Sequence, residues 1–207
     1  MPTTQALELV MMNIDQSYLA LDLELNQPSR KVIQVGIAIA YPKQLQSQYW
    51  TRQWLLDPDE PIAPAITSLT GITNADIQTR AVAWELMASE LSALIVTHNT
   101  FINPVTWGGA DSAELLAALK DRGIAFRHFG RRWIDIKTCH VMLMLAQGKS
   151  HVGGLRSVMG RHGITFKGVA HRADIDAANT LRLFFKLLVQ HASDLLPDRN
   201  WAQHHEI

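Results

Sequence analysis

The chain has 207 residues, of which 47% are hydrophobic, so it can form a well-filled core and is neither a disordered tail nor a mini-protein. Lysine plus arginine equal aspartate plus glutamate at 19 each, so the formal net charge is zero. A net charge of zero gives no sign of a broad electrostatic attraction to nucleic acid or to an anionic membrane. An anionic substrate would have to be held locally, by metal or by a small basic cluster. The one cysteine, Cys139, excludes an internal disulfide framework and a multi-cysteine zinc site.

The first sixteen residues read as a poor signal peptide. They lack a basic start, and Glu8 interrupts their short apolar run. No stretch approaches the 18 or so apolar residues of a membrane span. We therefore expect a cytoplasmic protein with no membrane partner.

Three strand-like stretches come first, at residues 18–25, 32–40 and roughly 47–56. The links between them are short and rich in turn formers, which favours an antiparallel meander. A proline-rich segment follows, with room for one short helix at about residues 65–70. Thr73 and Asp76 then resemble a capping box, and residues 81–95 have helix-forming composition.

The rhythm then changes to alternating strands and helices. Strands are expected at 101–107 and 131–136, and helices at 111–123, 137–148, 153–163 and from 174 to about 195. A meander followed by this alternation predicts an α/β fold with a mixed sheet of about five strands flanked by helices. With no repeat or linker to divide it, residues 1–207 are expected to form a single domain.

Two carboxylates interrupt the otherwise apolar first strand, YLALDLEL. Asp22 and Glu24 are two residues apart, so their side chains share one face of the strand. The pair could simply be solvated on an open sheet face. Apolar flanks, and an apolar second strand, instead favour a divalent metal, because hard cations take oxygen ligands and neutralise the repulsion between carboxylates.

A third carboxylate, Asp111, follows the expected strand 101–107 through two glycines. The alternative interpretation is structural, since Asp111 with Glu114 is an acceptable helix cap. Gly108 and Gly109, however, would let a ligand approach closely here.

The segment GVAHRADIDAANT opens the last long helix. His171 and Asp176 are compatible as partners if His171 lies on the preceding loop and Asp176 in the first turns. The alternative is a helix capped by Asp174 with an exposed histidine. A histidine with an ordinary pKa near 6.5 can take a proton from water at neutral pH.

Taken together, the D-x-E motif, the later Asp and the final H-x4-D resemble the DEDD exonuclease superfamily, and within it the histidine-containing DEDDh, or DnaQ-like, branch. The resemblance spans about residues 17–190 and includes IQVGIAIA, LDPDEPIAPAITSLTGIT, TWGGAD and HRADIDAANT. It is closest to compact members with a W-G-x-x-D motif, which include Eri-1-like exonucleases and bacterial relatives.

The resemblance implies a ribonuclease H-like sheet and a 3′→5′ exonuclease that releases nucleoside 5′-monophosphates. It implies two divalent cations, Mg²⁺ or Mn²⁺, with Asp22 bridging both. Glu24 and Asp176 would complete the site of the nucleophile-side ion, Asp111 would hold the second ion, and His171 would be the general base.

The same resemblance suggests how the terminal nucleotide is held. Gly71 and Ile72 match the loop against the terminal base, while Leu23 and Leu25 match contacts around the terminal sugar. Trp107 could stack on a base. For Ile72 and Trp107 the alternative is core packing.

A basic stretch that lacks acidic residues runs from residue 156 to Arg172 and could steer phosphates to the site. A solvated helix face is the alternative. The expected partners are 3′ ends of single-stranded RNA or DNA, and family members are often homodimers. An inactive nucleic-acid binder, or a proofreading-type subunit of a larger assembly, is the other functional interpretation.

Overall fold

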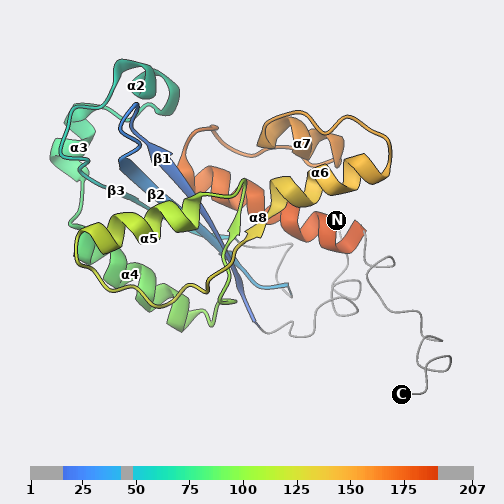
Figure 1. Cartoon of the computed structure of the whole chain (residues 1–207), viewed down its shortest axis with the longest axis horizontal. Coiled ribbons are helices and arrows are strands. Elements are labelled where there is room, and N and C mark those ends of the chain that lie inside the picture. Colours follow the sequence, from blue (N-terminus) through green and yellow to red (C-terminus); the bar gives the residue numbers. More distant parts are fainter. Residues whose placement is uncertain (1–15, 43–48, 191–207) are drawn as a thin grey trace.

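The computed structural model describes residues 16–42 and 49–190 (Figure 1). These residues build a five-stranded sheet in the order β3-β2-β1-β4-β5. The strands are β1 (Tyr18–Leu25), β2 (Val32–Ala40), β3 (Trp50–Leu55), β4 (Val105–Thr106) and β5 (Ile134–Asp135). The β1–β2 and β2–β3 pairs are antiparallel, whereas β1–β4 and β4–β5 are parallel. The expected mixed sheet with a meander is confirmed.

Seven helices lie within the described ranges: α2 (Pro64–Thr70), α3 (Asn74–Arg80), α4 (Trp84–Thr97), α5 (Asp111–Asp121), α6 (Ile136–Ala146), α7 (Leu155–Arg161) and α8 (Ala173–Gln190). None of them is long and apolar enough to cross a membrane. The end expected for the last helix, and the start expected for the third strand, lie outside the described residues.

The capping box at Thr73 is confirmed, but it begins a separate short helix. The Asp76 N–H donates to the Thr73 hydroxyl over 3.1 Å, and the Asp76 carboxylate accepts from the Thr73 N–H over 3.0 Å. The helix expected at residues 81–95 starts only at Trp84, because Val82 is drawn to the sheet and donates its N–H to the Leu55 carbonyl.

The strands expected at 101–107 and 131–136 are reduced to two paired residues each. Pro104 has no N–H to donate and so shortens the first. Its carbonyl still accepts from Ile134 over 2.8 Å, which begins the β4–β5 pairing. Arg131, Arg132 and Trp133 are exposed, so the second strand has no apolar face to bury before Ile134.

The two faces of the sheet carry separate cores. Leu19, Leu21 and Leu23 of β1 pack with apolar residues of α4 and α5. Ala20, on the other face, packs with apolar residues of α6, α7 and α8. Because side chains alternate along a strand, Asp22 and Glu24 continue the Ala20 face, toward α8.

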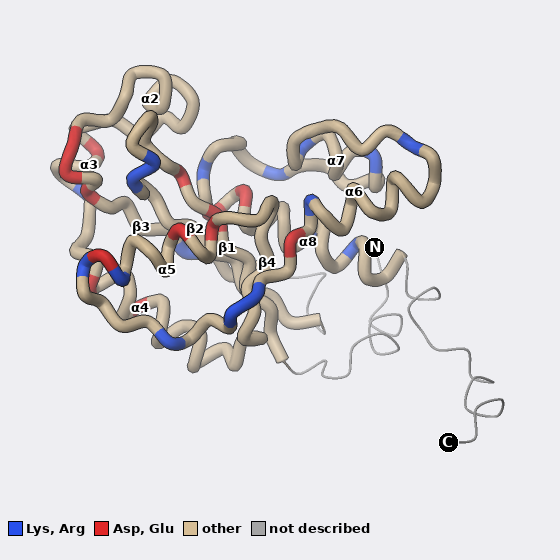
Figure 2. The backbone as a smooth tube through the Cα atoms, in the orientation of Figure 1, with Lys and Arg blue, Asp and Glu red and all other residues tan. Residues whose placement is uncertain are grey.

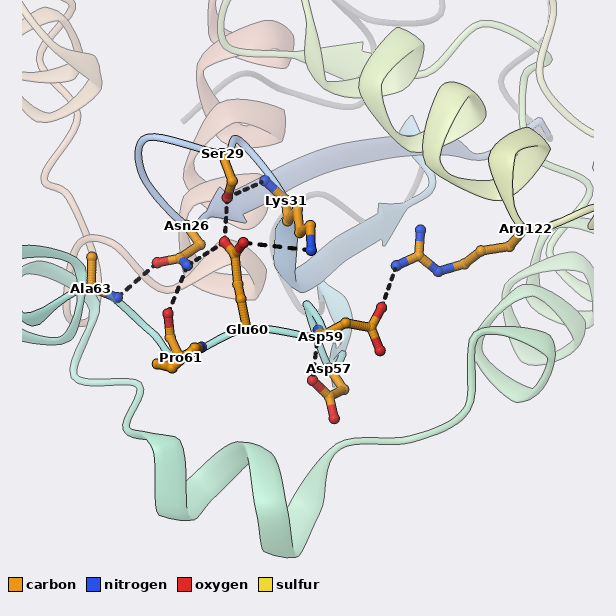
Figure 3. A network of polar contacts seen from close by, with 9 residues as sticks. All are labelled: Asn26, Ser29, Lys31, Asp57, Asp59, Glu60, Pro61, Ala63 and Arg122. Atoms are coloured by element: carbon orange, nitrogen blue, oxygen red, sulfur yellow. Dashed lines mark hydrogen bonds and ion pairs between the residues drawn. The ribbon is translucent and has the colours of Figure 1, made fainter.

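A polar network ties the end of β1 to the segment before α2 (Figure 3). Buried Asn26 donates to the Glu60 carboxylate over 2.7 Å and to the Pro61 carbonyl over 3.0 Å, and it accepts from the Ala63 N–H over 2.9 Å. Ser29 also donates to Glu60. The network holds the segment that leads into α2 beside the carboxyl end of β1.

Candidate active site

The site lies at the edge of the sheet where the parallel strands β1, β4 and β5 end. In parallel arrangements this carboxyl edge is where ligands bind. Asp22 pairs with Gly36 of β2, and Glu24 pairs with Gln34. Figure 2 shows acidic positions gathered where β1 meets the starts of α5 and α8.

The electrostatics of Asp22 show how closely the acids lie. Burial raises the pKa of Asp22 well above its usual range, and the charges of Asp111, Glu24 and Asp176 raise it further. Burial likewise raises the pKa of Glu24 to about 7, with Asp176 and Asp111 contributing. The structure thus brings together four carboxylates that were expected to share a site.

Asp111 is the first residue of α5, not its cap. Ala110 occupies the capping position, and no side chain caps this helix end, so the capping interpretation of Asp111 is wrong. Burial raises the pKa of Asp111 to about 7, helped by Glu114 and Asp135 and opposed by Arg30.

His171 and Asp176 are joined across the start of α8. His171 precedes the helix with φ of 61°, and its main-chain N–H donates to the Asp176 carboxylate over 2.9 Å. Burial raises the pKa of Asp176, an effect that His171 partly offsets by this bond and by its charge. Ligand-type atoms of Glu24, His171 and Asp176 lie within 4.8 Å of one another.

Asp174 lies inside the first turn of α8, so the interpretation that it caps the helix is wrong. The same interpretation also expected an exposed histidine. This part of it is confirmed, because His171 is exposed. Exposure on a loop that faces buried carboxylates leaves this side chain open to water and to a ligand.

Most of the side chains expected around the terminal nucleotide pack in apolar clusters. Leu23 and Leu25 pack in the α4–α5 core, on the opposite face of β1 from Glu24, so only their main chain lies toward the acids. Trp107 is partly buried against the α8-side core. Ile72 is 7% exposed and packs with apolar residues of β2, β3, α2 and α3. This agrees with the alternative interpretation of Ile72 as a core residue.

A pocket lined in part by Gln34, the residue of β2 that pairs with Glu24, nevertheless brings together three of the expected contacts. Gly71, Ile72 and Arg172 all line it. Gly71 ends α2 in the left-handed conformation with φ of 75°. The Arg172 Nε atom lies 3.6 Å from the Asp174 carboxylate.

Comparisons with known proteins identify solved structures of similar architecture. No family model matches the chain, and no curated protein matches it. Cell-death related nuclease 4 superposes with a TM-score of 0.70 at 16% identity, over 84% of this chain and 64% of that chain. The nuclease domain of 3′hExo, a DEDDh family member bound to rAMP, superposes with a TM-score of 0.67 at 14% identity, over 88% and 95%. The chain has the fold of these nucleases.

A third similar structure is the zinc-bound E. coli ExoI–ssDNA complex, with a TM-score of 0.65 at 15% identity, over 87% of this chain and 42% of that one. The chain thus spans less than two thirds of both cell-death related nuclease 4 and ExoI. The expected ribonuclease H-like architecture is confirmed by this likeness to DEDDh nucleases.

Within this DEDDh fold, Asp135 supports the loop that carries Asp111. Its carboxylate accepts from the Gly108 N–H over 3.1 Å and caps α6 through the Thr138 N–H over 3.1 Å. Sequence reasoning gave Asp135 no role. The signal was present, because an Asp three residues before Thr138 at the start of a helical run is a capping pattern.

Asn179 is a second residue without an expected role. Its side-chain amide donates to the Lys167 carbonyl over 2.9 Å, and its oxygen accepts from the Lys167 N–H over 3.1 Å. These bonds fasten the loop that leads to His171 against α8. A buried amide inside a mostly apolar helix face was the available signal.

Proposed function

We propose that the chain is a metal-dependent 3′→5′ exonuclease. It removes nucleoside 5′-monophosphates one at a time from single-stranded RNA or DNA, within a single domain whose core is about residues 17–190. The observation that carries the proposal is the gathering of four carboxylates beside His171: ligand-type atoms of Glu24, His171 and Asp176 lie within 4.8 Å of one another, and the charges of Asp111 and Asp176 raise the pKa of both Asp22 and Glu24. The structural likeness to 3′-exonucleases supports a nuclease function.

The carboxylates fit divalent cations. Burial and mutual repulsion disfavour the ionised form of Asp22, and a cation would relieve both. The donors are carboxylate oxygens with one imidazole nearby, a set that suits Mg²⁺ or Mn²⁺. Two such ions would be held by Asp22, Glu24, Asp111 and Asp176.

Bound ions would supply charge stabilisation to the attacking and leaving oxygens of an in-line displacement. The chain supplies the proton transfer, since His171 is exposed and can accept a proton from the attacking water. The bond from the His171 N–H to Asp176 holds the histidine loop beside the acids while its ring is free to act.

The 3′ end is proposed to occupy the pocket at Gly71, Ile72 and Arg172. Main-chain groups of Leu23 and Leu25 would flank the terminal sugar. Arg172 is the cation of this pocket nearest in sequence to His171, and it would contact a phosphate. Trp107, which is partly buried, would offer only its exposed part to a base.

The test is to incubate the protein with 5′-labelled single-stranded RNA and DNA in Mg²⁺, Mn²⁺ or EDTA. The expected result is a ladder that shortens from the 3′ end, is absent in EDTA and is absent for Asp22→Ala. Internal cuts, or cleavage in EDTA, would contradict the proposal. One comparison structure holds rAMP and another ssDNA, so both nucleic acids are included. The comparisons give the expected homodimer no support.

A further inference from the structure

Trp133 is an exposed aromatic residue that the proposed chemistry does not use. It immediately precedes β5, and 36% of its surface is exposed. A Cβ placed on Gly109 would stand 3.7 Å from the Trp133 indole nitrogen and 3.7 Å from the Asp135 carboxylate. The indole therefore lies against the loop that leads into Asp111.

Three exposed cations surround Trp133 in the sequence: Arg131, Arg132 and Lys137. No ion pair or hydrogen bond involves their side chains among residues 16–42 and 49–190. The nearest acid in sequence, Asp135, is already engaged by the Gly108 and Thr138 N–H groups. Their charge is therefore available to a polyanion. We call Arg131, Arg132, Trp133 and Lys137 the β5 surface.

The order of the strands sets the β5 surface on one side of the acids and the Gly71–Ile72 pocket on the other. Ile72 packs with Ile33 of β2 and Leu55 of β3, whereas the β5 surface lies at the opposite edge of the sheet. Asp22 and Glu24, on the central strand β1, lie between them. A strand whose 3′ nucleotide occupies the pocket would cross the acids and continue over β5.

We propose that the β5 surface binds the nucleotides on the 5′ side of the scissile phosphate, an inference that rests on the proposed function. Trp133 stacks on a base, as aromatic residues do in single-strand binders, and the three cations contact phosphates. The residues beside β5 would then add contacts to several nucleotides beyond the one in the Gly71–Ile72 pocket. A purely structural role, in which Trp133 only supports Gly109, is the competing explanation.

The experiment compares a substrate that reaches the β5 surface with one that cannot. Cleavage of a 12-nucleotide single strand is measured beside hydrolysis of the p-nitrophenyl ester of thymidine 5′-monophosphate, which has no upstream nucleotide. The variants are Trp133→Ala and the double variant Arg131→Gln/Arg132→Gln. One matched control is Trp50→Ala, which removes a tryptophan of nearly equal exposure (37%) from β3, the opposite edge strand. The other is Arg127→Gln, on the same loop as the two arginines.

Trp133→Ala should reduce the preference for the 12-mer over the ester about tenfold, which is the scale of one stacked base. The arginine double variant should also reduce this preference, because it removes two phosphate contacts. The controls should keep the wild-type preference. Equal losses on both substrates would overturn the proposal and assign Trp133 to supporting the Gly109 loop. The arginine double variant changes only exposed side chains, so it decides the case if Trp133→Ala fails to fold.

Binding is measured separately with Asp22→Asn protein and a fluorescent 12-mer at several salt concentrations. The double variant should lower the slope of log affinity against log salt by roughly 1.4, or about 0.7 for each phosphate that an arginine no longer neutralises. An unchanged slope would overturn the inference. If the wild type cleaves neither substrate, the proposed function fails, while the binding result still judges the β5 surface.

Discussion

Gly36 faces Asp22 across the β1–β2 ladder, and the start of α8 lies directly against it. A Cβ on residue 36 would stand 2.1 Å from the main-chain carbon of Ala173 and 2.1 Å from the nitrogen of Asp174. Only glycine lets the helix approach the strand this closely, and that approach carries Asp176 to Asp22.

Gly36→Ala should therefore displace the start of α8 and separate the acids. We expect a loss of roughly 1–3 kcal/mol in unfolding free energy from overpacking, and a fall in cleavage rate of at least about 100-fold for an ångström-scale misplacement. Chemical denaturation and the cleavage assay measure these. Gly160→Ala in α7, where a Cβ meets nothing within 4 Å, is the control and should be neutral or stabilising. If Gly36→Ala cleaved at the wild-type rate, the close contact between Gly36 and the start of α8 would not be needed to position Asp176.

His171→Asn tests whether the histidine is a base or a ligand. Asparagine tolerates the left-handed conformation that this position adopts, so the loop is preserved. Cleavage should slow by about 10²–10⁴-fold, the usual contribution of a general base. Mn²⁺ affinity measured by calorimetry should stay nearly intact. Loss of Mn²⁺ binding together with activity would instead make His171 a metal ligand, as its closeness to Glu24 and Asp176 permits.

Asn179→Ala should weaken the loop before His171, because it removes the two bonds to Lys167. We expect a destabilisation of about 1–3 kcal/mol from the loss of these two hydrogen bonds, at roughly 0.5–1.5 kcal/mol each. Amide hydrogen exchange should rise at residues 165–171, and kcat should fall. Thr79→Ala, which removes an exposed hydroxyl bond on α3, serves as the control. Unchanged exchange in this loop would show that α8 holds it by other contacts.

Stability without metal should fall as pH rises. Glu24 and Asp111 have folded-state pKa values of about 7, above their ordinary values of 4.5 and 3.8, so the folded protein retains protons that the unfolded chain releases. The stabilising contribution is complete below about pH 4 and is lost as pH passes 7. The change is at most roughly 3–4 kcal/mol for Glu24 and roughly 4–5 kcal/mol for Asp111, at about 1.36 kcal/mol per pKa unit.

Thermal unfolding in EDTA between pH 5 and 8 measures this trend, and Asp111→Asn should reduce it. Saturating Mn²⁺ should raise the melting temperature most at pH 8, because cations bind the ionised acids and stabilise the folded state by mass action. A melting temperature that saturating Mn²⁺ leaves unmoved would count against the four carboxylates as a cation site.

The sequence was informative where periodicity and chemistry agreed. The strand YLALDLEL appears with the predicted bounds, and both of its carboxylates lie at the acidic cluster. His171 lies on a loop before the helix, as its spacing to Asp176 required. These are local patterns, in which a few neighbouring residues decide the outcome.

Tertiary contacts decided the features that the sequence did not indicate. Val82 leaves the helical pattern because its N–H pairs with Leu55, which is far away in the sequence. Asp111 looks like a helix cap in isolation, but the structure supplies Ala110 at that position. Asp135 and Asn179 act through main-chain groups of distant loops, and side-chain identity alone does not reveal such partners.

The strands that carry the acidic cluster differ in length, so its carboxylates are held by pairings of different stability. Asp22 and Glu24 lie on β1, which is paired along its whole length with β2, whereas Asp111 follows a two-residue β4 that is joined to a two-residue β5. Segments with few hydrogen bonds and few buried contacts open at lower free energy than the rest of a structure. Opening of the β4–β5 side would therefore release one carboxylate while the other three stay assembled, so Asp111 would be the last acid to be organised and the first to be released.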